Sequence, residues 1–119
     1  MRVLDSIVQI ANRKADGILS KYEISGRTNA MVACYPGEGS HYVTHVDNPN
    51  RDGRVITAIY YLNKDWDIAK DGGALKMYSK YGEGPVAEVE PIFDRMMFFW
   101  SDRRNPHEVL PANRDRYIL

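Results

Sequence analysis

Residues 30–62 read AMVACYPGEGSHYVTHVDNPNRDGRVITAIYYL. Three short apolar or alternating runs, 30–35, 42–47 and 54–62, are separated here by proline, glycine and asparagine, which are the residues that turns require. Runs of the same kind follow at 74–79, 86–90, 95–100, 107–110 and 116–119. Eight short strands predict a closed barrel or a double sheet, because such folds solve the problem of exposed strand edges.

The sequence before these runs has a different period. Between residues 3 and 19 the apolar positions recur at steps of three and four, which predicts one amphipathic helix over 3–19 with Asp5 or Ser6 as its N-cap. A length of 119 residues fits a single domain over 1–119. The last predicted strand stops at Leu119 in the middle of an apolar run, so we expect a fragment of a longer domain.

Composition narrows the class of protein. The chain is 44% hydrophobic and 27% charged, which is typical of a globular domain. Lysine plus arginine and aspartate plus glutamate both number 16, so no net charge attracts nucleic acid or an anionic membrane. Charged residues among the first twenty exclude a signal peptide or a membrane span there. A single cysteine, Cys34, excludes an internal disulfide and favours the cytoplasm or nucleus; we expect it to pack in the core.

Two histidines and an aspartate form a candidate metal site. His45 and Asp47 are two residues apart in the predicted strand 42–47, so the strand period directs both side chains to one side. His107, at the start of a later strand, is the best third ligand. Two histidines and one carboxylate make the facial triad of non-heme Fe(II) oxygenases. The His-x-Asp spacing also arises by chance, which leaves core or surface histidines as the alternative.

A rival zinc site would use His41 and His45, because residues four apart share one face of a helix. Gly37 and Gly39 precede this pair and Pro49 follows it, so the local pattern argues against a helix. The role of His41 stays open.

Other residues suit a bound anion. Arg116 follows His107 on the last predicted strand, where its guanidinium could grip the distal carboxylate of a dicarboxylate such as 2-oxoglutarate. An exposed arginine near the chain end is the alternative. Tyr35, Tyr42 and Tyr61 lie on strands around the candidate ligands, and a phenol offers one hydroxyl to a bound carboxylate. For each tyrosine, core packing is the alternative.

Four segments together resemble the HIF prolyl hydroxylases, the oxygen-sensing prolyl 4-hydroxylase domain enzymes. The segments are MVACYPG (31–37), HVDNPN (45–50), IYYLNKDW (59–66) and FFWSDRRNPHEV (98–109). The resemblance runs from about Gly26 to the C-terminus. It implies a double-stranded β-helix, a jelly-roll barrel with the metal between its two sheets.

The resemblance also implies a role for each site residue. Fe(II) would be held by His45, Asp47 and His107. The distal carboxylate of 2-oxoglutarate would pair with Arg116 and Tyr61, and its metal-proximal end would lie near Tyr35. Around the substrate, Tyr42 and Leu75 would line the pocket, and Arg54 would lie at the entrance for the prolyl residue. The loop 48–53 would then be the substrate flap.

The implied activity is hydroxylation of a prolyl residue in a protein, with a HIF-alpha-like subunit of the hypoxia response as the expected substrate. The co-substrates would be 2-oxoglutarate and O2, with ascorbate as a supporting reductant, and a monomer without nucleic-acid or membrane partners is expected. The alternatives are a hydroxylase of another cytoplasmic protein and a truncated, inactive paralogue that binds metal or a partner. Compared with the family, the chain lacks the long N-terminal portion, and His41 and residues 79–85 differ.

Overall fold

The computed structural model describes residues 2–14 and 17–119. These residues form two helices and eight strands. In chain order they are α1 (Arg2–Lys14), β1 (Ala33–Tyr35), β2 (Ser40–His45), β3 (Ile56–Tyr60), α2 (Ile68–Asp71), β4 (Leu75–Tyr78), β5 (Pro85–Val89), β6 (Met96–Trp100), β7 (His107–Ala112) and β8 (Arg116–Ile118).

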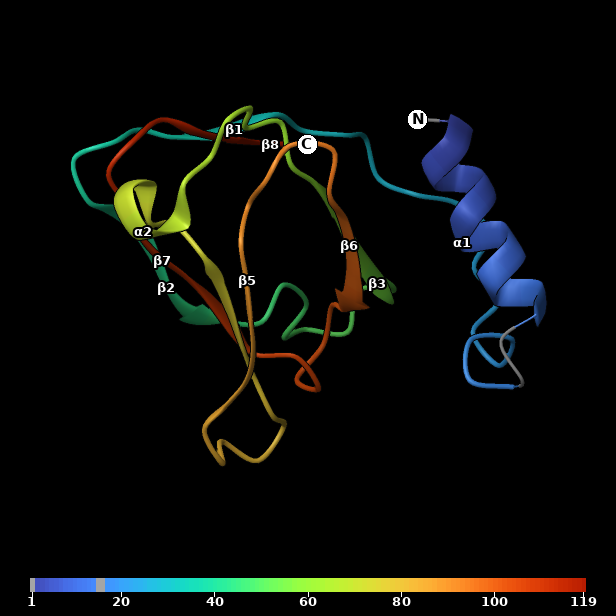
Figure 1. Cartoon of the computed structure of the whole chain (residues 1–119). Helices are drawn as coiled ribbons and strands as arrows, with labels where there is room; N and C mark the ends of the chain where they lie inside the picture. Colours follow the sequence, from blue (N-terminus) through green and yellow to red (C-terminus); the bar gives the residue numbers. More distant parts are fainter. Residues whose placement is uncertain (1, 15–16) are drawn as a thin grey trace.

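The strands form two antiparallel rows that face each other (Figure 1). In one row, β1 pairs with β8 and β3 pairs with β6, and two backbone hydrogen bonds between Tyr60 and Leu119 join these pairs. We call this row, β1-β8-β3-β6, the first sheet. The other row, β2-β7-β4-β5, is the second sheet. Consecutive strands alternate between the two rows except for β4 and β5, which form a hairpin within the second sheet, and this connectivity is that of a jelly roll. The predicted double-stranded β-helix is confirmed.

The core lies between the two sheets and depends on strand alternation. In β4 the side chains of Leu75 and Met77 are buried while their neighbours are partly exposed. Val109 of β7 and Phe99 of β6 complete this apolar cluster. In β7 the same alternation that buries Val109 also buries His107. A polar side chain therefore points into the barrel beside the apolar core.

All eight predicted strands are present, with shifts at their ends. The prediction began the first strand at residue 30, whereas β1 begins at Ala33. Ala33 pairs with Ile118 of β8, while Leu119 turns to pair with Tyr60. The expectation of a buried Cys34 was wrong, because Cys34 is exposed. In β1 its two neighbours are half-buried, so alternation turns the thiol outward and Tyr35 inward.

The helices differ more from the sequence prediction. The predicted helix 3–19 ends at Lys14, and residues 17–21 form turns in which Gly17 adopts a φ of 78°. The predicted helical residues Ala15 and Asp16 lie outside the described residues. The short helix α2, with the side chain of Asp67 as its N-cap, was missed. Neither helix in the described part of the chain is long and apolar enough to cross a membrane.

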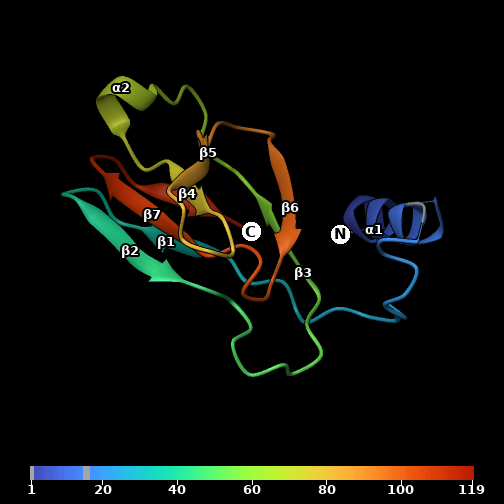
Figure 2. The same ribbon diagram turned by 90° about the horizontal axis from the view of Figure 1, so that it is seen from below.

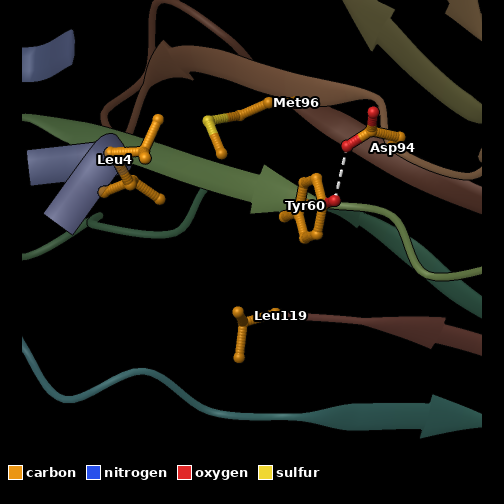
Figure 3. Close-up of a pocket in the computed structure, with 6 residues that line it drawn as sticks. Leu4, Tyr60, Asp94, Met96 and Leu119 are labelled. Carbon is orange, nitrogen blue, oxygen red and sulfur yellow. Dashed lines mark hydrogen bonds between the residues drawn. The ribbon is translucent and has the colours of Figure 1, made fainter. Parts of the chain in front are cut away.

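Helix α1 stands on the β3 and β6 side of the barrel, opposite α2, in both views (Figures 1 and 2). Leu4 of α1 faces a small pocket at the rim of the barrel, where Tyr60, Met96 and Leu119 meet (Figure 3). The hydroxyl of Tyr60 donates a hydrogen bond of 2.5 Å to Asp94 at the edge of this pocket. Its lining is mainly apolar, and the candidate metal ligands lie in a different cavity.

Candidate metal centre

The structure brings His45, Asp47 and His107 together. One ligand atom from each residue can be chosen so that all of these atoms lie within 4.8 Å of one another. The Nε2 atoms of His45 and His107 lie 3.3 Å and 3.5 Å from Oδ1 of Asp47. The two histidines face each other directly, because His45 is paired with His107 in the register of β2 and β7. Sheet pairing therefore fixes two of the three groups.

The hydrogen bonds of the imidazoles determine which nitrogen is free. Nδ1 of His45 contacts the carbonyl oxygen of Val43 at 2.8 Å, and Nδ1 of His107 contacts that of Asn105 at 3.0 Å. A carbonyl oxygen only accepts, so each Nδ1 carries a proton and donates it. In the neutral imidazoles, both Nε2 lone pairs are then directed at Asp47. Two such lone pairs and a carboxylate oxygen in close contact fit a cation, and the Nδ1 contacts are those that commonly orient metal-binding histidines.

Asp47 reaches the cluster from outside the strand. The sequence prediction placed it on the strand 42–47, but β2 ends at His45. The chain leaves β2 because the backbone N–H of Asn48 donates to the carbonyl of Ser101 at 2.8 Å. Thr57 donates a hydrogen bond of 2.5 Å to Oδ2 of Asp47, leaving Oδ1 for the imidazoles. The two-residue spacing was informative, although strand alternation was the wrong reason.

The protonation of this cluster favours an ionised carboxylate. Without a metal, Nε2 of His107 can hold a second proton and donate it to Asp47. Burial raises the pKa of Asp47, but this hydrogen bond, the one from Thr57 and the charge of protonated imidazoles outweigh it and lower the pKa. Burial lowers the pKa of His107, and its hydrogen bonds to Asp47 and Asn105 more than reverse that effect. An anionic oxygen between two imidazoles is a suitable donor set for a divalent metal such as Fe(II).

Arg116 lies fully buried in the same barrel. Its Nε donates to the carbonyl of Gly73 at 2.9 Å. Its two terminal nitrogens are buried and have no hydrogen-bond partner among the described residues. The guanidinium carbon lies 5.1 Å and 5.2 Å from the ring centroids of Tyr35 and Tyr61. A buried cation with unsatisfied donors is costly unless an anion binds it, so this arrangement fits a carboxylate ligand.

The two tyrosines shape the space around Arg116. Tyr61 is completely buried, and Tyr35 is partly exposed at the cavity. Burial raises the pKa of both phenols, so both keep their proton and can donate to an anion. The hydroxyl of Tyr61 donates to the sulfur of Met97 at 3.7 Å, and this sulfur is a weak acceptor.

One long cavity contains both features. It opens between the barrel and the segment that precedes β1, with His45, Asp47, His107 and Arg116 in its lining. Of the other predicted site residues, Tyr35, Arg54 and Leu75 line the same cavity. Arg54 is exposed and held by Asp52 through a 2.7 Å ion pair. Tyr42 and Tyr61 are not among the residues that line this cavity. The ring of Tyr42 lies edge-on to that of His45 with centroids 4.4 Å apart, and Tyr61 is buried beside Arg116.

The rival zinc pair is not formed. His41 and His45 both lie on β2, and the imidazole of His41 is exposed and contacts the carbonyl of Gly39. Two residues that matter at the site were absent from the sequence prediction, namely Thr57 and Ser101. Both occur within ordinary strand sequence, and only the pairing of β3 with β6 brings them together beneath Asp47.

Gly73 allows Arg116 its position, which gives a first prediction. Gly73 has a φ of 71°, and an added Cβ would lie 3.1 Å from both Cδ of Arg116 and Cβ of Ala112. We expect Gly73→Ala to reduce the free energy of unfolding by about 1–3 kcal/mol, from backbone strain and crowding together. Urea denaturation measures this change.

Gly82→Ala is the matched control, because Gly82 has a φ of 72° with nothing within 4 Å of the added Cβ. Gly82→Ala therefore introduces the backbone strain without the crowding. Equal losses for both variants would contradict the proposed crowding against Arg116.

Comparisons with known proteins agree with this geometry. Residues 30–119 match the 2OG-Fe(II) oxygenase superfamily. The chain is 60% identical to Egl nine homolog 1 of Homo sapiens over 107 residues, which is 90% of this chain and 25% of that protein. It is 49% identical to the hypoxia-inducible factor prolyl hydroxylase of Caenorhabditis elegans over 117 residues, 98% of this chain and 15% of the relative.

A solved structure is similar as well. A prolyl hydroxylase from Trichoplax adhaerens, in complex with a hypoxia inducible factor oxygen degradation domain peptide fragment, is 51% identical with a TM-score of 0.84. The match covers 98% of this chain and 52% of that one. The chain thus spans about a quarter of the human relative and about half of this structure. The resemblance to HIF prolyl hydroxylases, which the four sequence segments predicted, is confirmed.

Proposed function

Because the chain belongs to the 2OG-Fe(II) oxygenase superfamily, we propose that it is the catalytic core of an Fe(II)- and 2-oxoglutarate-dependent prolyl hydroxylase. The observation that carries this proposal is the combination of two features in one cavity. A His-Asp-His cluster lies there with a buried guanidinium whose terminal nitrogens have no partner among the described residues. The cluster supplies donors for a metal, and the guanidinium supplies the complementary charge for a dicarboxylate.

The residues of this chain divide the work as follows. His45, Asp47 and His107 would hold Fe(II), which activates O2 so that 2-oxoglutarate is decarboxylated to succinate and carbon dioxide while a prolyl C–H becomes C–OH. Arg116 binds the distal carboxylate through its two terminal nitrogens, for which the described residues offer no hydrogen-bond partner. Tyr61 donates its hydroxyl to the same carboxylate, and Tyr35 borders the cavity beside it. The chain thereby orients the co-substrate and neutralises its charge.

The open shape of the cavity supports a protein substrate. Its lining continues from the candidate metal ligands past Arg54 to the segment 22–31, which is exposed except at the partly buried Tyr22 and Ile24. Such an extended wall suits a peptide better than a small molecule. The T. adhaerens enzyme binds a peptide of hypoxia inducible factor, and we propose a HIF-alpha-like peptide as the substrate here. Arg54 at the cavity mouth is then placed to contact the residues around the target proline.

The proposal is tested with the purified chain, Fe(II), 2-oxoglutarate, ascorbate and a proline-containing HIF-alpha peptide. We expect succinate release coupled to a peptide mass gain of one oxygen atom, and no gain in a peptide with alanine in place of the target proline. Mass spectrometry and succinate quantification measure both products. Succinate without peptide oxidation would favour another protein substrate. Absence of succinate would favour an inactive paralogue that only binds metal or a partner.

A further inference from the structure

The carboxylate of Asp47 is held from the sheet opposite to the histidines. His45 and His107 belong to β2 and β7 of the second sheet. Oδ2 of Asp47 instead accepts from Thr57 of β3, and the hydroxyls of Thr57 and Ser101 lie 3.0 Å apart. Ser101 follows β6 and is only 1% exposed. The cluster therefore joins the two sheets. The hydroxyls of Thr57 and Ser101 connect its carboxylate to the first sheet.

The chemistry of these groups fixes the direction of the hydrogen bonds. A carboxylate oxygen only accepts, so the hydroxyl of Thr57 donates its one proton to Oδ2 of Asp47. The bond between the two hydroxyls must then run from Ser101 to Thr57. Ser101 donates to Thr57, and Thr57 donates to Asp47. Each bond polarises the next, which strengthens the contact to the carboxylate.

Ser101 also fixes the backbone around Asp47. Its carbonyl accepts from the backbone N–H of Asn48 at 2.8 Å, and its own N–H donates to Val55 at 3.0 Å. The side chain of Asn48 in turn donates to the carbonyl of Arg54 at 2.9 Å. Asp47 has left β2 and lacks the support of a strand, so these bonds replace it.

We propose that Thr57 and Ser101 are positioning residues for the metal centre, an inference that rests on the proposed function. They hold Oδ2 of Asp47 so that Oδ1 alone faces the two imidazoles. Without the donated proton, the carboxylate rotates more freely and presents either oxygen or both. Hydrogen bonds to a ligating carboxylate commonly change metal affinity by about 10–100-fold.

The test is a titration of the full chain with Co(II), followed by visible absorption. Thr57→Val keeps the shape of the side chain and removes the donor, and we expect it to raise the Kd for Co(II) by about 10–100-fold. Thr57→Ser retains the donor and should stay within about threefold of the unchanged chain. Ser101→Ala removes the hydrogen bond from Ser101 to Thr57 and leaves the one from Thr57 to Asp47. Its Kd for Co(II) should lie between the values for Thr57→Ser and Thr57→Val. If Thr57 had a purely structural role, its variants would lower thermal stability, and Thr57→Ser would not restore the affinity for Co(II).

The outcomes separate this inference from the proposed function. If the unchanged chain binds Co(II) and Thr57→Val binds it equally well, the positioning role is wrong while the metal centre stands. Equal weakening by Thr57→Val and Thr57→Ser would also overturn the role of the hydroxyl. If the unchanged chain binds no Co(II), both proposals fail. If Thr57→Val does not fold, the Kd for Co(II) of Ser101→Ala is compared with that of the unchanged chain. Equal values would reject the proposal.

Discussion

Replacing His107 by alanine abolishes 2-oxoglutarate-dependent succinate release and raises the Kd for a divalent metal by more than about a hundredfold, if His107 is a ligand. Removing a hydrogen bond behind a ligand already costs about 10–100-fold in affinity, so loss of the ligand itself must cost more. His107 is 4% exposed, and its Nε2 lies 3.5 Å from Oδ1 of Asp47, so alanine at this position removes one of the three ligand atoms. Succinate assay and Co(II) titration measure the two effects.

His41→Ala provides the matched histidine control. His41 lies on β2 like His45, but its ring is exposed and contacts the carbonyl of Gly39. This variant should bind metal and turn over like the unchanged chain. Retained turnover in His107→Ala would refute the ligand assignment, and so would equal losses in the two variants.

The second large effect is expected at Arg116. Arg116→Ala should raise the apparent KM for 2-oxoglutarate by at least about a hundredfold, because two charge-assisted hydrogen bonds, each worth about 1.5–3 kcal/mol, are removed. It should leave metal affinity nearly unchanged, since Arg116 does not contact the His-Asp-His cluster. The free energy of unfolding should also change, because the carbonyl of Gly73 loses its partner. Initial rates at varied 2-oxoglutarate measure the KM.

Two variants make this result specific. Arg116→Lys keeps the charge without the planar fork and should recover part of the affinity. Arg114→Ala removes an arginine two positions earlier, whose side chain is half-exposed and pairs with Asp71 outside the cavity. It should leave the KM for 2-oxoglutarate unchanged. An Arg116→Ala variant with an unaltered KM would count against the dicarboxylate site.

Much of this architecture follows from local sequence. The strands were predictable because each alternates or runs apolar between turn residues, and the two-row topology is a common way for eight antiparallel strands to protect their edges. His45 and Asp47 were identifiable from their spacing, and His107 and Arg116 from their positions on later strands. Which tyrosine faces inward was not predictable from the pair Tyr60 and Tyr61. The structure buries Tyr61 and leaves the hydroxyl of Tyr60 on the outside with Asp94.

The features that sequence reasoning missed depend on contacts between distant segments. Helix α2 spans only Ile68–Asp71, which is too short to produce a helical period. Asp47 lies beyond β2 because a carbonyl of Ser101 binds the next residue, and that bond joins positions far apart in the chain. The contact between Thr57 and Asp47 likewise requires the two sheets to be stacked. Such contacts leave no local pattern in the sequence.

The central claim is that three side chains bind one metal ion while Arg116 binds a dicarboxylate across the same cavity. The most direct measurement is a crystal structure of the chain grown with Mn(II) and 2-oxoglutarate, with anomalous scattering used to locate the metal. We predict one anomalous peak that places the metal ion within coordination distance of Nε2 of His45, Oδ1 of Asp47 and Nε2 of His107. We also predict a 2-oxoglutarate carboxylate hydrogen-bonded to the terminal nitrogens of Arg116. A peak bonded to other residues, or Arg116 without a carboxylate partner in the occupied site, would contradict it.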